Sequence, residues 1–257
     1  MGPRLGRWLG WLVLLGGAGR LLAQDNYEIQ VYGSETVDPG ATMVELHSNY
    51  TIDGARQTTD GTFPSYHAIH ETLEITHGFT PWFEVGYYIF TSDQPGHGYG
   101  WVGDHLRPRV RVPESWHWPV GVSLSTEVGY ERPEFSADTW TWELRPIIDK
   151  QLGPWYLAVN PALEKSLHGP NSHRNWEFAP SGKVSYALTK RIAAGIEYYS
   201  SLGELTHFDT LQGQQQEIVP AIDLDLGPRW EFNFGVGFGL TSVTDGLLVK
   251  MILGRKF

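Results

Sequence analysis

"WEFNFGVGFGL", residues 230 to 240, alternates two kinds of side chain along its whole length. Large apolar residues occupy every even position, whereas the odd positions carry Glu231, Asn233 and three glycines. Successive side chains of a β-strand point to opposite faces. This period of two therefore predicts a strand with one apolar face and one small or polar face.

The same alternation recurs from Thr42 to the end of the chain. In "PVGVSLSTEVGYE" (119–131), Val, Leu and Tyr side chains are opposed to Gly, Ser and Glu. We count twelve such segments, an even number that lets both ends of a closed barrel lie on one side of a membrane. Prolines stand at outward positions inside five of them, where we expect local bulges, and these are Pro108, Pro146, Pro161, Pro180 and Pro220.

The connections between the segments alternate in length. Short turns recur 35 to 38 residues apart, at Pro81, Pro119, Pro154, Lys190 and Pro228, and longer polar stretches lie between them. Outer-membrane barrels have this asymmetry, with tight periplasmic turns and long extracellular loops. A soluble sandwich also alternates, but it does not need an aromatic outer face with tryptophans near the strand ends. The sequence predicts an all-β fold, a closed antiparallel transmembrane β-barrel of about twelve strands.

The first residues, "MGPRLGRWLGWLVLLGGAGRLLAQDN", have the layout of a secretory signal peptide. A basic start precedes a short apolar run, and a small residue, Ala23, precedes polar Gln24. The apolar run is too short for a spanning helix of about 20 residues. We expect a signal peptide at 1–23, an N-terminal periplasmic segment at 24–41, and an outer-membrane barrel at 42–257 with both termini in the periplasm.

Composition excludes several other classes of protein. A formal net charge of −10 gives no basic footprint for nucleic acid, and the absence of cysteine excludes disulfides and thiolate sites. "GYGWVG" (98–103) resembles a dinucleotide-binding motif but lacks the βαβ context, and no HExxH motif occurs. We expect no cofactor and no metal.

Charged residues on the inward parity are the candidates for a solute pathway. Arg107, Arg109 and Arg111 form a row on one strand face, opposite acids of the neighbouring strands. Such a row either neutralises itself in a cross-strand ladder or contacts an anionic solute directly, and the two roles are compatible. The predicted lumen-lining residues are Glu84, His105, Arg107, Arg109, Arg111, Glu127, Glu143, Arg145, Glu177, Lys183, Glu197 and Asp223.

A twelve-stranded barrel should leave a narrow passage, because eight strands are filled by side chains and sixteen leave an open channel. We therefore predict a channel for small solutes, aromatic or anionic in character. The alternatives are a lipid-modifying barrel enzyme and a non-conducting structural or adhesin barrel. No GxSxG motif occurs, and His47 and Ser48 lie on opposite strand faces, so we expect no enzyme.

Two further stretches bear on assembly and family. The last strand, "GLLVKMILGRKF" (246–257), ends on Phe257 and resembles the signal by which the barrel-assembly machinery recognises outer-membrane proteins. We expect this machinery and outer-membrane lipid as partners. "YEIQVYGSETVDPGATMVELHSNYT" (27–51) and "FTPWFEVGYY" (79–88) resemble the outer-membrane transporter family of the MetA pathway of phenol degradation. The resemblance implies a barrel that passes small molecules. It implies no catalytic residues.

Overall fold

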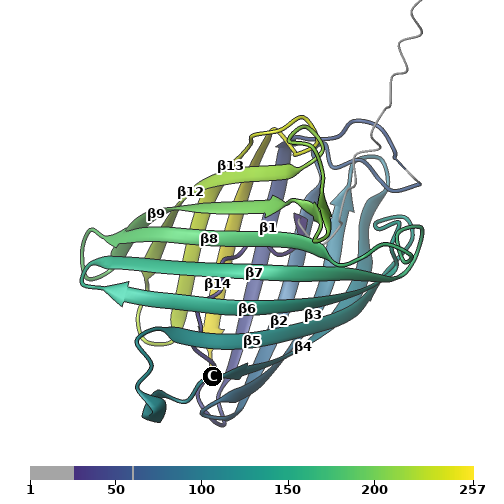
Figure 1. The fold of residues 1–257 in the computed structure, drawn as a ribbon. Helices are drawn as coiled ribbons and strands as arrows, with labels where there is room; N and C mark the ends of the chain where they lie inside the picture. The colour runs from purple at the N-terminus through teal and green to yellow at the C-terminus, as the bar shows by residue number, and fades with distance from the viewer. Residues whose placement is uncertain (1–25, 60) are drawn as a thin grey trace, which may run out of the picture.

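The computed structural model describes residues 26–59 and 61–257, so the predicted signal peptide lies outside the described residues. Strands of ten to fourteen residues form one antiparallel sheet that closes on itself (Figure 1). The twelve long strands are β1 (Thr42–Asp53), β2 (Ile69–Thr80), β3 (Phe83–Gln94), β4 (Gly98–Arg111), β5 (Gly121–Glu131), β6 (Trp140–Leu152), β7 (Trp155–His168), β8 (Glu177–Ala187), β9 (Ile192–Ser201), β12 (Gln215–Asp225), β13 (Trp230–Gly239) and β14 (Leu247–Lys256). Two-residue strands, β10 (Gly203–Glu204) and β11 (His207–Phe208), lie in the loop after β9, and a short 3-10 helix, η2 (Glu114–Trp116), lies between β4 and β5.

Closure is made by the first and last strands. Each long strand pairs with the next along the chain, and β1 pairs with β14 from Met43 opposite Lys256 to Asp53 opposite Leu247. The ring therefore has no free edge, and the prediction of a closed twelve-stranded barrel is confirmed. Among the described residues, no helix has the length and apolar character needed to cross a membrane.

The two ends of the barrel differ. The lower end carries the short turns, and there the backbone groups of Thr42 and Phe257 bond to each other at 2.8 and 3.2 Å. The upper end carries the long loops, two of which meet at Asp245, whose carboxylate accepts a 2.7 Å hydrogen bond from Ser65 Oγ. Burial raises the pKa of the Asp245 carboxyl above its ordinary value. This asymmetry agrees with the sequence prediction except around β4, where the upper connection from β3 is only residues 95–97 and the lower connection to β5 spans residues 112–120.

The five strand prolines do not cause bulges, so that expectation was wrong. Pro108 stays in register with Val85 on β3, and the β4–β5 register is the same before and after it. Pro146 likewise pairs in register with Leu124 on β5. The physical reason is that a strand residue directs its N–H to one neighbour only. A proline therefore interrupts one ladder and leaves the other intact.

Side chains alternate strictly between the inside and the outside of the barrel. The outer face carries large apolar residues, among them Leu106, which is 47% exposed. Tryptophans gather towards the strand ends, with Trp82 and Trp155 at the lower turns and Trp101 and Trp140 near the upper loops. Such bands mark the two interfaces of a membrane.

Residues 26–38, which we call the lumen segment, run through the barrel interior to its lower mouth, where Glu35 and Asp38 are exposed. Tyr27, Ile29 and Tyr32 are 2 to 5% exposed, and Tyr27 packs against Phe90 of β3 with ring centroids 5.4 Å apart. We expected residues 24–41 on the periplasmic side. Residues 26–34 instead run through the interior, where inward side chains bond to their backbone polar groups, and residues 38–40 are exposed.

The outer face predicts a depth-dependent response to charge. Leu106→Arg places a guanidinium midway between Trp101 and the lower turns, where an arginine costs about 2–4 kcal/mol. Val110→Arg, at the lower end of the same strand, should cost about 0–1 kcal/mol. Urea unfolding in phospholipid vesicles measures both, and equal losses would contradict the assigned membrane position.

Candidate functional site

Four charged residues on one side of the interior form what we call the arginine cluster: Glu74, Glu84, Arg107 and Arg109. Arg107 donates to Glu74 at 2.7 Å and to Glu84 at 3.2 Å, and Arg109 Nε lies 2.7 Å from Glu84. All four side chains are at most 8% exposed. Paired charges of this kind compensate each other's loss of hydration.

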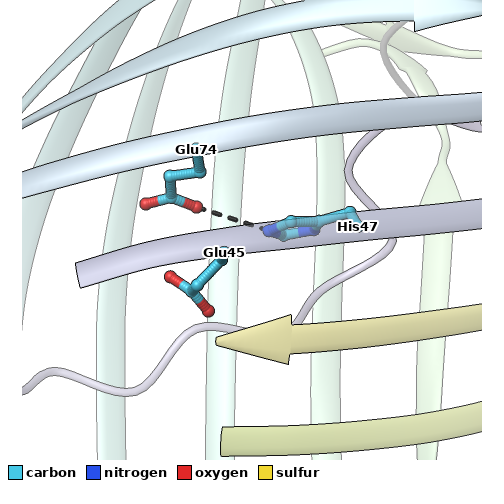
Figure 2. A group of neighbouring side chains, drawn as sticks. All are labelled: Glu45, His47 and Glu74. Atoms are coloured by element: carbon cyan, nitrogen blue, oxygen red, sulfur yellow. Dashed lines mark ion pairs between the residues drawn. The ribbon is translucent and has the colours of Figure 1, made fainter. Parts of the chain in front are cut away.

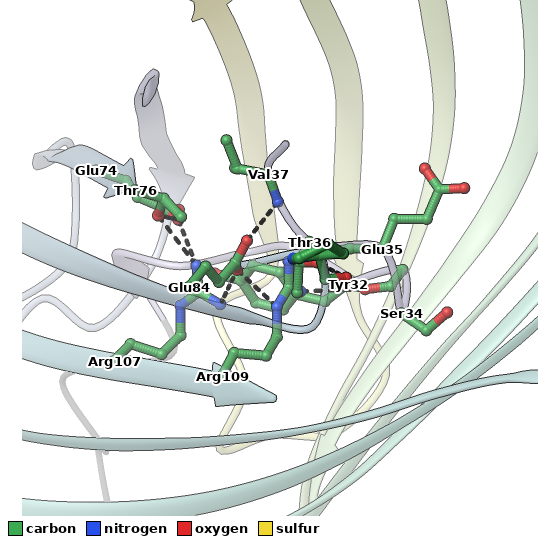
Figure 3. Close-up of polar contacts among 12 residues, drawn as sticks. Tyr32, Ser34, Glu35, Thr36, Val37, Glu74, Thr76, Glu84, Arg107 and Arg109 are labelled. Carbon is green, nitrogen blue, oxygen red and sulfur yellow. Dashed lines mark hydrogen bonds and ion pairs between the residues drawn. The ribbon is translucent and has the colours of Figure 1, made fainter. Parts of the chain in front are cut away.

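The arginine cluster also holds the backbone of the lumen segment (Figure 3). Arg109 donates to the carbonyls of Gly33 and Glu35, and the second oxygen of Glu84 accepts a 2.6 Å bond from Val37 N–H. The predicted cross-strand ladder therefore exists in altered form, with the lumen segment as one of its partners.

A second anchor for the lumen segment comes from the opposite wall. The side-chain amide of Asn160 on β7 accepts from Tyr32 N–H at 2.7 Å and donates to the Tyr32 carbonyl at 3.0 Å. The Tyr32 ring lies between two guanidinium groups, 5.3 Å from Arg107 and 4.9 Å from Arg145. Asp149 on β6 accepts from both the backbone and the hydroxyl of Ser34. These contacts reproduce for one extended peptide what a neighbouring strand supplies in a sheet.

The acids expected to face the arginine row from β5 have another partner. His105 Nδ1 lies 2.6 Å from Glu127, and His105 Nε2 lies 3.6 Å from Glu131. Glu143 pairs with Arg145 at 2.5 Å on the same strand. On the inward face of β4, His105 thus contacts β5, whereas Arg107 and Arg109 contact β2, β3 and the lumen segment.

The opposite side of the barrel holds the lysine cluster, which consists of Lys183, Glu197, Asp223 and Lys250. Lys183 lies 3.2 Å from Glu197 and 2.8 Å from Asp223. Lys250 pairs with the other oxygen of Glu197 and donates a 2.7 Å bond to the carbonyl of Ile29. The lumen segment is therefore held from this side as well.

The remaining two predicted residues lie at the barrel ends. Arg111 lies at the lower mouth and pairs with Glu114, whose side chain is 83% exposed. Glu177 lies at the upper end and accepts a 2.8 Å bond from Ser201. All twelve predicted residues thus occupy inward positions. They belong to the arginine cluster, to the pairs on β4–β6, to the lysine cluster or to the two ends of the barrel.

Sequence reasoning missed the inward residues of β1 and β2. Glu45, His47 and Glu74 are at most 7% exposed. Their parity was readable, since in "MVELHSNYT" Met43, Glu45 and His47 alternate with Val44 and Leu46. No local pattern could assign the lumen segment, because its partner Asn160 is 128 residues from Tyr32.

The interior is filled unevenly. On β2, every second residue from His70 to Thr76 is at most 4% exposed, whereas on β8 only Ser185 is buried. A lower cavity of about 910 Å³ opens beside the arginine cluster. A side cavity of about 420 Å³ adjoins the lysine cluster, and an upper cavity of about 80 Å³ lies above it. Gln30 of the lumen segment lines all three cavities.

Comparison with known proteins agrees with this architecture. The structure is similar to the KdgM porin in complex with disordered oligogalacturonate, with a TM-score of 0.50, 9% identity, and 84% of this chain and 98% of that chain covered. It is also similar to the NanC porin, with a TM-score of 0.56, 8% identity, and coverage of 83% and 98%. The fold is that of an outer-membrane β-barrel.

The comparisons do not identify the family of this chain. No family model matches the chain, and no curated protein matches its sequence. The resemblance to the MetA-pathway transporters therefore stays a prediction.

The expectation that the chain is not an enzyme needs correction. LpxR from Salmonella typhimurium, a barrel lipid A deacylase, is among the similar structures, with a TM-score of 0.41, 8% identity, and coverage of 83% of this chain and 99% of that chain. The missing GxSxG motif does not by itself exclude an enzyme.

The arginine row predicts two very different costs within one strand. Arg107→Met leaves the carboxylates of Glu74 and Glu84 buried with one cation fewer, which should cost about 3–5 kcal/mol. Arg111→Met removes only a pair at the exposed mouth, which should cost about 0–1 kcal/mol. Urea unfolding of the refolded barrel measures both changes. Similar losses in the two variants would show that the cluster at Arg107 has no special role in stability.

Proposed function

We propose that the chain is an outer-membrane channel for small solutes, with its path along the wall formed by β7–β9 and β12–β14. The observation that carries this proposal is the uneven filling of the interior. The lower cavity opens beside the arginine cluster, and the side and upper cavities follow one another between the lumen segment and the wall of β7–β9 and β12–β14. Solutes would pass beside the lumen segment while it stays in place.

The upper cavity, with the lysine cluster below it, is the smallest of the three cavities. A volume of about 80 Å³ accepts only a few water molecules, since each occupies about 30 Å³ in the liquid. Tyr199 lines the upper cavity, and its hydroxyl bonds to both Lys250 and Glu197. The channel would therefore favour ions and small polar molecules over large solutes.

The charge balance of the path favours cationic and neutral solutes over the anionic ones that the arginine row first suggested. Arg107 and Arg109 are paired with carboxylates and backbone carbonyls, so their positive charge is largely compensated and attracts an anion only weakly. In the side cavity, two lysines face four carboxylates, and these charged residues are Lys183, Lys250, Glu197, Asp223, Asp225 and Glu231. A constriction of net negative charge raises the local concentration of cations.

The orientation and targeting of the barrel are part of the proposal. The lower end, with its short turns and Phe257, would face the periplasm, and residues 1–23 would be removed on export. The barrel-assembly machinery would bind the last strand, and the apolar outer face would contact outer-membrane lipid. The resemblance to the MetA-pathway transporters is consistent with passage of small molecules.

Planar-bilayer recordings in a salt gradient test the channel and its path. The wild type should show conductance steps with a preference for cations. Asp223→Asn removes a charge from the side cavity and should lower the cation-to-anion permeability ratio by up to roughly fivefold, as a loss of about 1 kcal/mol implies. Asp104→Asn changes the net charge equally on the outward face and serves as the matched control.

Two results would count against the proposal. Absence of conductance steps from a correctly folded barrel would reject the channel. An unchanged permeability ratio in Asp223→Asn would remove the side cavity from the path and leave the channel itself in place.

A further inference from the structure

Three buried residues that the proposed channel does not use lie together on the inner wall of β1 and β2 (Figure 2). Glu45 and His47 are successive inward residues of β1, and Glu74 on β2 pairs directly with Glu45. One ligand atom from each residue lies within 4.8 Å of the other two. Two adjacent strands thus present two carboxylates and an imidazole to one point.

The imidazole has no ordinary hydrogen-bond partner. His47 is fully buried, and neither of its ring nitrogens makes a hydrogen bond within the part of the chain that the structure describes. Its Nε2 lies 3.4 Å from Glu74 Oε2, an oxygen that also makes no hydrogen bond there.

That distance has a specific meaning. It is longer than a normal N–H···O hydrogen bond of about 2.7–3.2 Å. Two ligands of one tetrahedral ion, each bound at about 2.0–2.1 Å, stand about 3.3–3.4 Å apart. The spacing of His47 Nε2 and Glu74 Oε2 therefore fits two ligands of one metal ion.

The charges at this point are incompletely matched. Like charges directly opposite each other in a sheet repel, as Glu45 and Glu74 must. Arg107 and Thr76 both donate to Glu74 Oε1, which leaves Oε2 for another partner. Glu45 is 7% exposed and makes no hydrogen bond or ion pair with any described residue. A buried carboxylate without a cation is costly, and a divalent ion would supply the missing charge.

We propose that Glu45, His47 and Glu74 bind a divalent transition-metal ion of the Zn²⁺ type, with water as a further ligand. Imidazole with carboxylates suits Zn²⁺ and Co²⁺, whereas Ca²⁺ and Mg²⁺ prefer oxygen ligands alone. Glu45 and Glu74 line the lower cavity, which gives the ion a route from the mouth of the barrel. The site lies on β1 and β2, beside β14 of the proposed solute path, but none of its three residues lines the side or upper cavity. The proposed metal site does not depend on the proposed channel.

The test uses the refolded full chain in detergent, titrated with Zn²⁺ in a calorimeter and with Co²⁺ by visible absorption. The variants Glu45→Gln and His47→Gln each remove one ligand and keep the side-chain length close to the original. His70→Gln is the matched control, because His70 is also a buried inward histidine with two unbonded ring nitrogens. The shift of electrophoretic mobility on heating verifies that each barrel is folded.

Wild type and His70→Gln should bind one Zn²⁺ per chain, and Glu45→Gln and His47→Gln should bind it at least about tenfold more weakly. Co²⁺ should give intense absorption bands of a four-coordinate ion with nitrogen and oxygen ligands. No saturable binding by folded wild type, or equal affinity in both ligand variants, would overturn the proposal. If the variants do not fold, the wild-type Co²⁺ spectrum decides, and a spectrum of a six-coordinate ion with oxygen ligands alone overturns it.

Discussion

The pairing of β1 with β14 is the interaction on which the rest of the structure depends. It joins residues near opposite ends of the chain and removes the last free edge of the sheet, so that every long strand has two long neighbours. In hydrocarbon, only such closure satisfies all backbone groups of a sheet. Once the ring closes, alternate side chains must face lipid or the interior, and the interior becomes a bounded space with charged walls.

A ring of twelve strands is too wide to be filled by its own side chains. The lumen segment supplies the missing material on one side, and its extended backbone brings polar groups that the walls must satisfy. Arg109, Asn160 and Lys250 donate to its carbonyls from three separate strands. The buried charges of the arginine cluster therefore support this peptide, and cavities remain both beside this cluster and along the wall of β7–β9 and β12–β14.

The sequence predicted the barrel well because the period of two persists through every strand and is read locally. It found the start of the alternation at Thr42, where β1 begins, and it assigned the twelve candidate lumen residues to the inward parity. What it could not predict depends on contacts between distant residues. The position of the lumen segment rests on partners such as Asn160, and the pairing of Arg107 with Glu74 requires two strands to be brought together by the fold. The prediction of bulges at the strand prolines was wrong for a related reason, since the effect of a proline depends on which neighbouring strand the missing N–H would have faced.

The central claim is that the lumen segment narrows a channel without closing it. Single-channel conductance of the chain from Gln24, compared with a variant whose residues 26–38 are replaced by a Gly-Ser linker of equal length, tests this most directly. The account predicts small, steady steps for the natural segment and clearly larger steps for the linker variant. If the natural chain shows no conductance and the linker variant conducts, the segment closes the lumen. If both show equal conductance steps, the segment does not lie in the path. Either result would contradict the account.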